Sequence, residues 1–163
     1  MKVRIFTDGA CSENPGPGGW AVVINTADKC RTISGNEKLT TNNRMELRAV
    51  IEAYKRIIRK ESRMTMSDYT YEIYSDSAYV VNAINNQWVE TWQKNNWQTT
   101  KREDVKNKDL WEAFDELRNK ANSLGICITL IKVKGHSGNT FNELVDKLAK
   151  AESMKAKEGS YNG

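Results

Sequence analysis

The chain of 163 residues contains few cysteines, only two prolines and no long apolar segment. Its longest uninterrupted apolar run covers the five residues 20–24, whereas a membrane-spanning helix needs about 20. The three cysteines, Cys11, Cys30 and Cys127, are widely spaced and form no C-x-x-C pattern. Isolated cysteines in odd number argue against a disulfide framework or a zinc site and are typical of a reducing compartment. We therefore expect a cytoplasmic protein that makes no contact with a membrane.

The charge balance is mildly positive. Lysine and arginine number 25 against 21 acidic residues, which gives a formal net charge of +4. An excess of this size favours an anionic partner but does not identify one. A chain of this length is expected to form a single domain. We place that domain at residues 1–154 and interpret the polar residues 155–163 as a disordered tail.

The hydrophobic pattern changes from alternating to helical along the chain. Three strand-like segments joined by short links come first and predict an antiparallel meander. Strand–helix alternation follows, which predicts an α/β domain with a mixed sheet. Residues 88–108, rich in tryptophan and lysine, are expected to protrude and are named the handle. The expected strands cover residues 2–8, 20–25, 29–36, 69–75 and 126–133, and the expected helices cover 43–60, 77–86, 88–95, 108–123 and 140–154.

Glu46 is a carboxylate on the apolar side of the expected helix 43–60. At about 100° per residue it shares a stripe with Ala49, Val50 and Ala53. A buried carboxylate is costly unless a cation, a proton or a metal ion accompanies it. The alternative is a capping box, in which Glu46 bonds back to Asn43 in the first turn.

Asp8 and Asp76 each follow a strand-like segment. Taken singly, Asp8 could belong to an Asp-Gly turn and Asp76 could be a helix N-cap. However, ligands bind at the carboxyl ends of the strands in open α/β sheets. Two acids at that edge, joined by Glu46 from a helix, would repel one another unless a divalent cation is present. The pattern therefore predicts a metal site.

Asp146 and His136 complete the group of candidate residues. Asp146 lies beside the apolar face of the last expected helix, where it could instead form a surface pair with Lys150. His136, the only histidine, stands between glycines in a loop before that helix, where it could titrate near neutral pH. Four carboxylates without a cysteine or histidine cluster favour Mg²⁺ or Mn²⁺ over zinc.

Six segments, in this order, resemble the motifs of type 1 ribonuclease H. The resemblance runs from about residue 3 to residue 151. The matching segments are TDGAC (7–11), NPGPGGW (14–20), TTNNRMEL (40–47), SDSAYV (75–80), VKGHSG (133–138) and NELVD (142–146).

The resemblance implies a ribonuclease H-like fold, with a five-stranded mixed sheet in the order 3-2-1-4-5 and helices on both faces. It also implies an endonuclease that hydrolyses the RNA strand of RNA–DNA hybrids with two Mg²⁺ ions, for which Mn²⁺ could substitute, and leaves 5′-phosphate and 3′-hydroxyl ends. By motif position, the metal ligands would be Asp8, Glu46, Asp76 and Asp146, and His136 would assist turnover.

The same resemblance implies contacts with each strand of the hybrid, bound by a monomer. The RNA strand would meet the side chains of Asn14, Asn42 and Asn43 and the backbone near Cys11 and Ser12. The DNA strand would meet the aromatic rings of Tyr79 and Trp88 and a phosphate pocket at Thr41 and Asn107. Within the handle, Trp92 and Trp97 are expected to form a small core of their own.

Two positions depart from the pattern of many relatives. Glu13 stands where many have glycine, which would put an extra negative charge near the RNA phosphates. Leu39 stands where some have arginine, so the match to the family's phosphate pocket is less complete. Neither departure touches the candidate metal ligands.

Two alternative functions remain open. One is a DNA-processing nuclease or strand-transfer enzyme of the same fold superfamily, and the other is a hybrid-binding module without catalysis.

Overall fold

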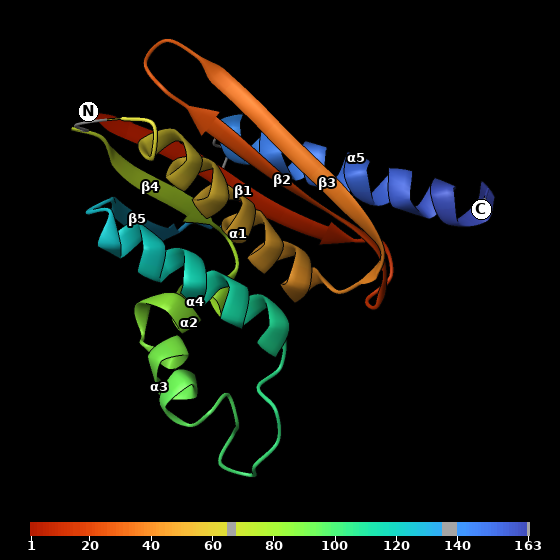
Figure 1. The fold of residues 1–163 in the computed structure, drawn as a ribbon. Helices are drawn as coiled ribbons and strands as arrows, with labels where there is room; N and C mark the ends of the chain where they lie inside the picture. The colour runs from red at the N-terminus through yellow and green to blue at the C-terminus, as the bar shows by residue number, and fades with distance from the viewer. Residues whose placement is uncertain (65–67, 135–139, 163) are drawn as a thin grey trace.

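The computed structural model describes residues 1–64, 68–134 and 140–162 and folds them into one sheet with helices on both faces (Figure 1). The sheet contains five strands in the order β3-β2-β1-β4-β5, as the resemblance implied. The elements are β1 (Lys2–Cys11), β2 (Gly16–Asn25), β3 (Cys30–Thr40), α1 (Asn42–Glu61), β4 (Thr70–Ser75), α2 (Ala78–Asn85), α3 (Trp88–Lys94), α4 (Lys108–Ser123), β5 (Cys127–Lys132) and α5 (Thr140–Asn162).

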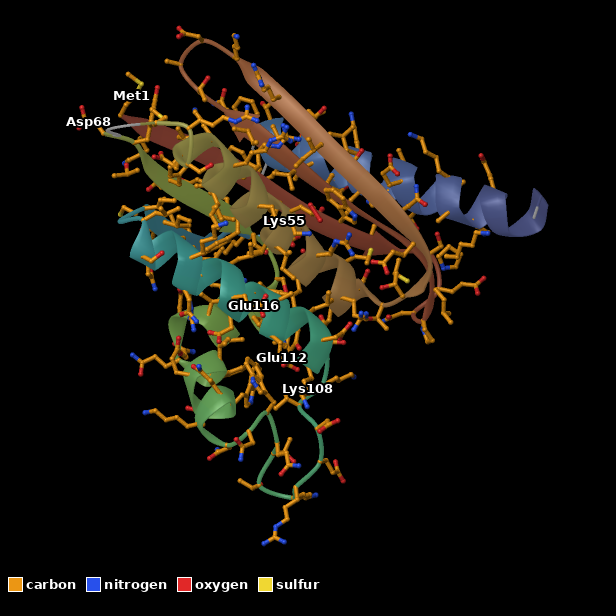
Figure 2. All side chains as sticks on the ribbon, viewed as in Figure 1. Met1, Lys55, Asp68, Lys108, Glu112 and Glu116 are labelled. Carbon is orange, nitrogen blue, oxygen red and sulfur yellow. The ribbon has the colours of Figure 1, made fainter. Side chains whose placement is uncertain are left out.

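The strand directions confirm a mixed sheet. Strands β1, β2 and β3 pair antiparallel in a meander, whereas β1, β4 and β5 pair parallel through helical crossovers. The chain start is fixed beside β4, because the Met1 amino group donates to the Asp68 carbonyl at 2.9 Å (Figure 2). The parallel half of the sheet therefore brings the carboxyl ends of β1 and β4 to the same edge.

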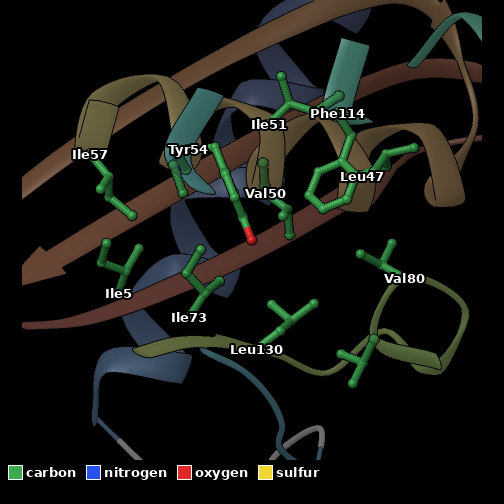
Figure 3. Close-up of a cluster of buried hydrophobic side chains, with 14 of the residues drawn as sticks. Ile5, Leu47, Val50, Ile51, Tyr54, Ile57, Ile73, Val80, Phe114 and Leu130 are labelled. Atoms are coloured by element: carbon green, nitrogen blue, oxygen red, sulfur yellow. The ribbon is translucent and has the colours of Figure 1, made fainter. Parts of the chain in front are cut away.

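The two faces of the sheet carry separate hydrophobic clusters. On one face, α1 packs its apolar stripe over β1 and β4, so that Val50 and Tyr54 face Ile5 and Ile73 (Figure 3). Helix α4 covers the outer side of α1 and adds Phe114 to this cluster. On the other face, α5 packs against β1, β2 and β3 over a smaller cluster.

Strand β1 continues further than the sequence predicts. It pairs with β2 up to Cys11, opposite Gly18, so Asp8 lies within a strand and not in an Asp-Gly turn. Strand β2 begins at Gly16, inside a stretch whose two prolines and three glycines favour a turn. The antiparallel ladder therefore overrides the local preference of these residues.

Helix α5 is also longer than predicted. It runs from Thr140 to Asn162 and so passes residue 154, where the sequence places the start of a tail. The extension has a physical reason, because the side chain of Ala156, beyond residue 154, is buried at 3% exposure. Among the described helices, none combines the length and the apolar composition that a membrane span requires.

The handle consists of α3 and the loop that leads to α4. It projects away from the sheet and carries charged side chains into solvent (Figure 2). The expectation of a separate tryptophan core is wrong, because Trp92 and Trp97 pack against the main cluster. The Trp92 ring lies 5.5 Å from the ring of Trp111, which is fully buried. The handle is thus anchored by the core of the domain.

Candidate metal centre and substrate surface

Asp8 and Asp76 occupy equivalent positions on neighbouring parallel strands. The last pair of the β1–β4 ladder is Phe6 with Tyr74, so each aspartate lies two residues beyond it. Because side chains alternate along a strand, the two carboxylates fall beside each other where the strands separate. Asp76 is not the N-cap of α2, since Ser77 accepts the hydrogen bond from Val80 N at 3.2 Å. The structure leaves the Asp76 carboxylate available to the site.

Glu46 reaches these aspartates from the first half of α1. The alternative, a capping box with Asn43, is not formed, because the N-cap is Thr41, whose hydroxyl accepts from Arg44 N at 3.2 Å. Helix α1 lies so close to β1 at Gly9 that a Cβ there would collide with the backbone of Met45 and Glu46. Glycine next to Asp8 therefore permits the helix to bring Glu46 against the strand.

The three carboxylates form a compact cluster. One oxygen each of Asp8, Glu46 and Asp76 lies within 4.8 Å of the others. Burial, and then the charge of Asp76, raise the pKa of Asp8 to about 7. Burial and the charges of Asp8 and Asp76 raise the pKa of Glu46 well above its usual range, and the two carboxyl groups share a hydrogen bond. Such a cluster gains stability from a bound cation.

These shifts predict that the metal-free protein loses stability as the pH rises. The Asp8 carboxyl, whose pKa is raised to about 7 in the folded state, keeps its proton over a pH range in which the same group of the unfolded chain has already lost it. The free energy of unfolding should therefore fall by roughly 2–4 kcal/mol between about pH 4 and pH 7. Urea unfolding in chelator at a series of pH values measures the slope, and Mg²⁺ should reverse the loss at pH 8. An Asp8→Asn variant with the same slope would contradict the assignment.

Asp146 lies beside the cluster, on helix α5 at the opposite face of the sheet, and is not among the three clustered carboxylates. It lines the same hollow as Asp8 and Asp76, and its charge contributes to the raised pKa of Asp8. It also forms the surface pair with Lys150, with 3.0 Å between Nζ and Oδ2. The sequence reasoning missed Lys134 and Lys147, which line this hollow as well. His136, the other catalytic candidate, lies outside the described residues.

The candidates for the RNA strand gather around the loop between β1 and β2. Ser12, Asn14, Asn42 and Asn43 are exposed. Asn14 Oδ1 accepts from Asn42 N at 3.2 Å, which joins this loop to the start of α1. The Cys11 thiol is half-buried and donates to the Glu13 carbonyl at 2.7 Å. The surface thus adjoins the helix that carries Glu46.

A second network joins the candidates for the DNA phosphate pocket. The Tyr79 hydroxyl accepts from Asn107 Nδ2 at 3.1 Å and from Trp111 Nε1 at 2.8 Å. Arg44, to which the sequence reasoning gave no role, donates to Asn107 Oδ1 at 3.4 Å through Nη1. Since its backbone bonds to Thr41, Arg44 connects the two expected pocket residues. Its guanidinium is held by two bonds to Asp109 of 2.9 and 2.7 Å.

The remaining substrate candidate, Trp88, lies at the start of α3 and is 40% exposed. Its ring lies 6.3 Å from that of Trp92, which anchors the handle. The two departures from the family pattern are surface residues, Glu13 being exposed and Leu39 76% exposed. Neither contacts the carboxylate cluster in the described part of the chain.

Comparisons with known proteins identify the family and the fold of this chain. The family model described as RNase H matches residues 1–154. The chain is 48% identical to a ribonuclease H of Syntrophomonas wolfei over 91% of this chain and 94% of that protein. It is 47% identical to a ribonuclease H of Acetivibrio thermocellus over 94% and 96% of the two chains. Among solved structures, LC9-RNase H1, described as a type 1 RNase H with the type 2 active-site motif, superposes with a TM-score of 0.74. It shares 27% identity over 95% of this chain and 73% of that chain.

Proposed function

Because the chain belongs to the ribonuclease H family, we propose that its carboxylate cluster is the site at which it hydrolyses the RNA strand of an RNA–DNA hybrid. The observation that carries this proposal is the approach of Asp8, Glu46 and Asp76 to within 4.8 Å at the sheet edge. Hydrolysis there leaves a 5′-phosphate and a 3′-hydroxyl. Asp146 extends the cluster across the same hollow.

The residues at the cluster fit divalent metal ions, and we propose Mg²⁺, with Mn²⁺ as a substitute. Glu46 Oε2 is buried without a hydrogen-bond partner among the described residues. A buried carboxylate oxygen in this state calls for a cation, and an all-oxygen donor set suits a hard one. Asp8, Glu46, Asp76 and Asp146 would hold the ions. When bound, a pair of such ions lowers the pKa of a water molecule and stabilises the charge on the leaving oxygen.

The chain's own residues would position the scissile phosphate. Asp8 and Asp76 are fixed by the sheet and Glu46 by α1, so the three carboxylates need little rearrangement before the reaction. Lys134 and Lys147 supply positive charge at the same hollow and would attract the phosphodiester. We assign His136 the transfer of a proton during turnover, as the family resemblance implies.

The two sides of the site would read the two strands of a hybrid bound by a monomer. Asn14, Asn42 and Asn43, with the backbone of Cys11 and Ser12, would meet the RNA sugars, whose 2′-hydroxyls distinguish RNA from DNA. Thr41 and Asn107 would bind a DNA phosphate, and the rings of Tyr79 and Trp88 would line the DNA channel.

The free thiols of Cys11, Cys30 and Cys127 support a reducing, cytoplasmic location.

The proposed function predicts that one missing 2′-hydroxyl beside the scissile phosphate blocks cleavage at that step. A buried acceptor left without its donor costs roughly 1–3 kcal/mol, or about 10- to 100-fold in rate. Phosphate contacts are indifferent to the sugar, so binding should change little. A single 2′-deoxy unit placed at successive positions, with the products mapped on a sequencing gel, tests this. Equal cleavage at the substituted step would mean that the active site does not read the 2′-hydroxyl.

Trp88→Ala is expected to raise KM for the hybrid about tenfold while kcat changes less than threefold. A stacking surface contributes roughly 1–3 kcal/mol to binding without touching the reacting atoms. Steady-state kinetics on a hybrid duplex measure both constants. Gln93→Ala, at an exposed position of the same helix, is the matched control and should behave as the parent. A loss of kcat at unchanged KM would place Trp88 outside the substrate channel.

A further inference from the structure

The hydroxyl of Ser153 is buried where helix α5 meets the loop between β1 and β2. Ser153 is 3% exposed. Its Oγ lies 2.7 Å from Ser12 Oγ and 3.1 Å from the carbonyl oxygen of Pro17. Ser12 itself is exposed. The pair therefore joins the inside of the domain to the surface assigned to the RNA strand.

The part of α5 that carries Ser153 is held firmly on the sheet. The neighbouring Glu152 carboxylate accepts from Ser34 Oγ at 3.1 Å and from Asn36 Nδ2 at 2.6 Å, so it binds the helix to β3. At Gly19 of β2 the helix comes so close that a Cβ would lie 2.5 Å from the Ala149 carbonyl oxygen. The backbone of α5 that carries Ser153 is thus held in place by contacts with β2 and β3.

The loop is closed on itself as well as on the helix. Ser12 N donates to the Pro17 carbonyl at 2.9 Å, which is the same oxygen that Ser153 contacts. Asn14 ties the loop to α1, which carries Glu46. A change at Ser153 is therefore expected to reach the RNA-facing surface through this loop.

Both contacts of Ser153 can be hydrogen bonds with only one arrangement of the two hydroxyl protons. A carbonyl oxygen can only accept, so Ser153 must donate its single proton to Pro17. Ser12 must then donate its own proton to Ser153. The exposed side of Ser12 Oγ is left with a lone pair and no proton.

We propose that Ser153 is a specificity-determining positioning residue, which makes Ser12 an acceptor for a 2′-hydroxyl of the RNA strand. The inference rests on the proposed function. A hydroxyl free to turn its proton outward would bind phosphate oxygens, which both strands possess. A hydroxyl held as an acceptor favours a donor, and the 2′-hydroxyl is the sugar group that RNA has and DNA lacks.

The test combines protein variants with single atoms of the substrate. Hybrids carry one 2′-fluoro ribonucleotide at successive positions of the RNA strand, because fluorine removes the proton that a 2′-hydroxyl donates. For the parent, kcat/KM should fall about tenfold at one position away from the cleaved step. In Ser153→Ala and in Ser12→Ala, fluorine at that position should lower kcat/KM less than twofold, while fluorine at the cleaved step should lower it as in the parent. Such non-additivity isolates the interaction between the Ser12 hydroxyl and the 2′-hydroxyl of the RNA.

Ser34→Ala is the matched control, since it removes a hydroxyl bond to α5 at Glu152 without touching Ser12. It should keep the fluorine profile of the parent. If Ser153→Ala lowers kcat/KM equally at all positions and keeps the parent profile, the role is structural and the inference is overturned. If Ser153→Ala does not fold, the test rests on Ser12→Ala alone. This variant must lose the sensitivity to fluorine at the position away from the cleaved step. If that sensitivity persists, the inference is overturned. Failure of the parent to cut the unmodified hybrid would instead refute the proposed function.

Discussion

Asp8→Asn is expected to reduce hybrid cleavage by about 1,000-fold or more while changing the dissociation constant less than threefold. Asp8 interacts electrostatically with both Glu46 and Asp76, so its loss removes one of the three clustered carboxylates that we propose to hold the cations. Affinity should persist, because it comes mainly from phosphate contacts and aromatic surfaces. Single-turnover cleavage with Mg²⁺ and fluorescence anisotropy in chelator measure the two quantities separately.

The control for Asp8→Asn is Asp28→Asn, in the exposed turn between β2 and β3. It removes one negative charge at a distance from the cluster and should leave cleavage within twofold of the parent. The metal-free Asp8→Asn protein should also be more stable than the parent above pH 7, because it lacks a charge that the cluster repels. Cleavage within tenfold of the parent would refute the role given to Asp8.

The carboxylate cluster could be predicted because its signals are local. Glu46 stands out by periodicity alone, since it shares a helical stripe with the apolar residues Ala49, Val50 and Ala53. Asp8 and Asp76 were found by their place after strand-like residues, although Asp8 lies inside β1. That error arose because the prolines and glycines at 14–19 suit a turn, and pairing with β2 is a non-local interaction that no local window contains.

Other parts of the molecule have no local signal. The attachment of α5 to β3 depends on polar partners of Glu152, namely Ser34 and Asn36, which are more than 100 positions away. The link from Arg44 to Asn107 spans 63 positions and likewise requires the folded chain. The substrate contacts came only from the family resemblance, since exposed asparagines and tryptophans carry no periodic pattern. Local pattern thus located the chemistry, and tertiary contacts decide how the surfaces around it are held.

The handle shows the same dependence on tertiary contacts through an ion network centred on Arg118. This side chain of α4 is 17% exposed and pairs with Glu90 of the handle. It also contacts Asp115 Oδ1 at 3.2 Å, and the Asp115 side chain is 10% exposed. Its guanidinium lies 5.4 Å from the centre of the Phe114 ring. One cation therefore neutralises two acids where α3 docks on the body of the domain.

Arg118→Met is expected to lower the free energy of unfolding by about 3 kcal/mol. Methionine keeps much of the apolar stem, so the loss reports the charge that leaves Glu90 and Asp115 uncompensated. In a chain of this size that corresponds to a melting temperature roughly 10 °C lower. Urea unfolding measures the loss, with Lys120→Met at an exposed position of α4 as the control, for which a change below about 0.5 kcal/mol is expected.

A second variant separates the loss of charge balance from the loss of packing. If stranded carboxylates cause the damage, neutralising them in the triple variant Arg118→Met, Glu90→Gln, Asp115→Asn should recover at least half of the lost stability. In the triple variant, the backbone amides of α3 should then be protected from hydrogen exchange to the same degree as in the parent. Recovery is expected because Glu90 Oε2 is already buried without a hydrogen-bond partner in the described chain, so its charge depends on Arg118. A triple variant as unstable as Arg118→Met would show that packing of the arginine stem, and not the ion network, holds the handle to the catalytic body.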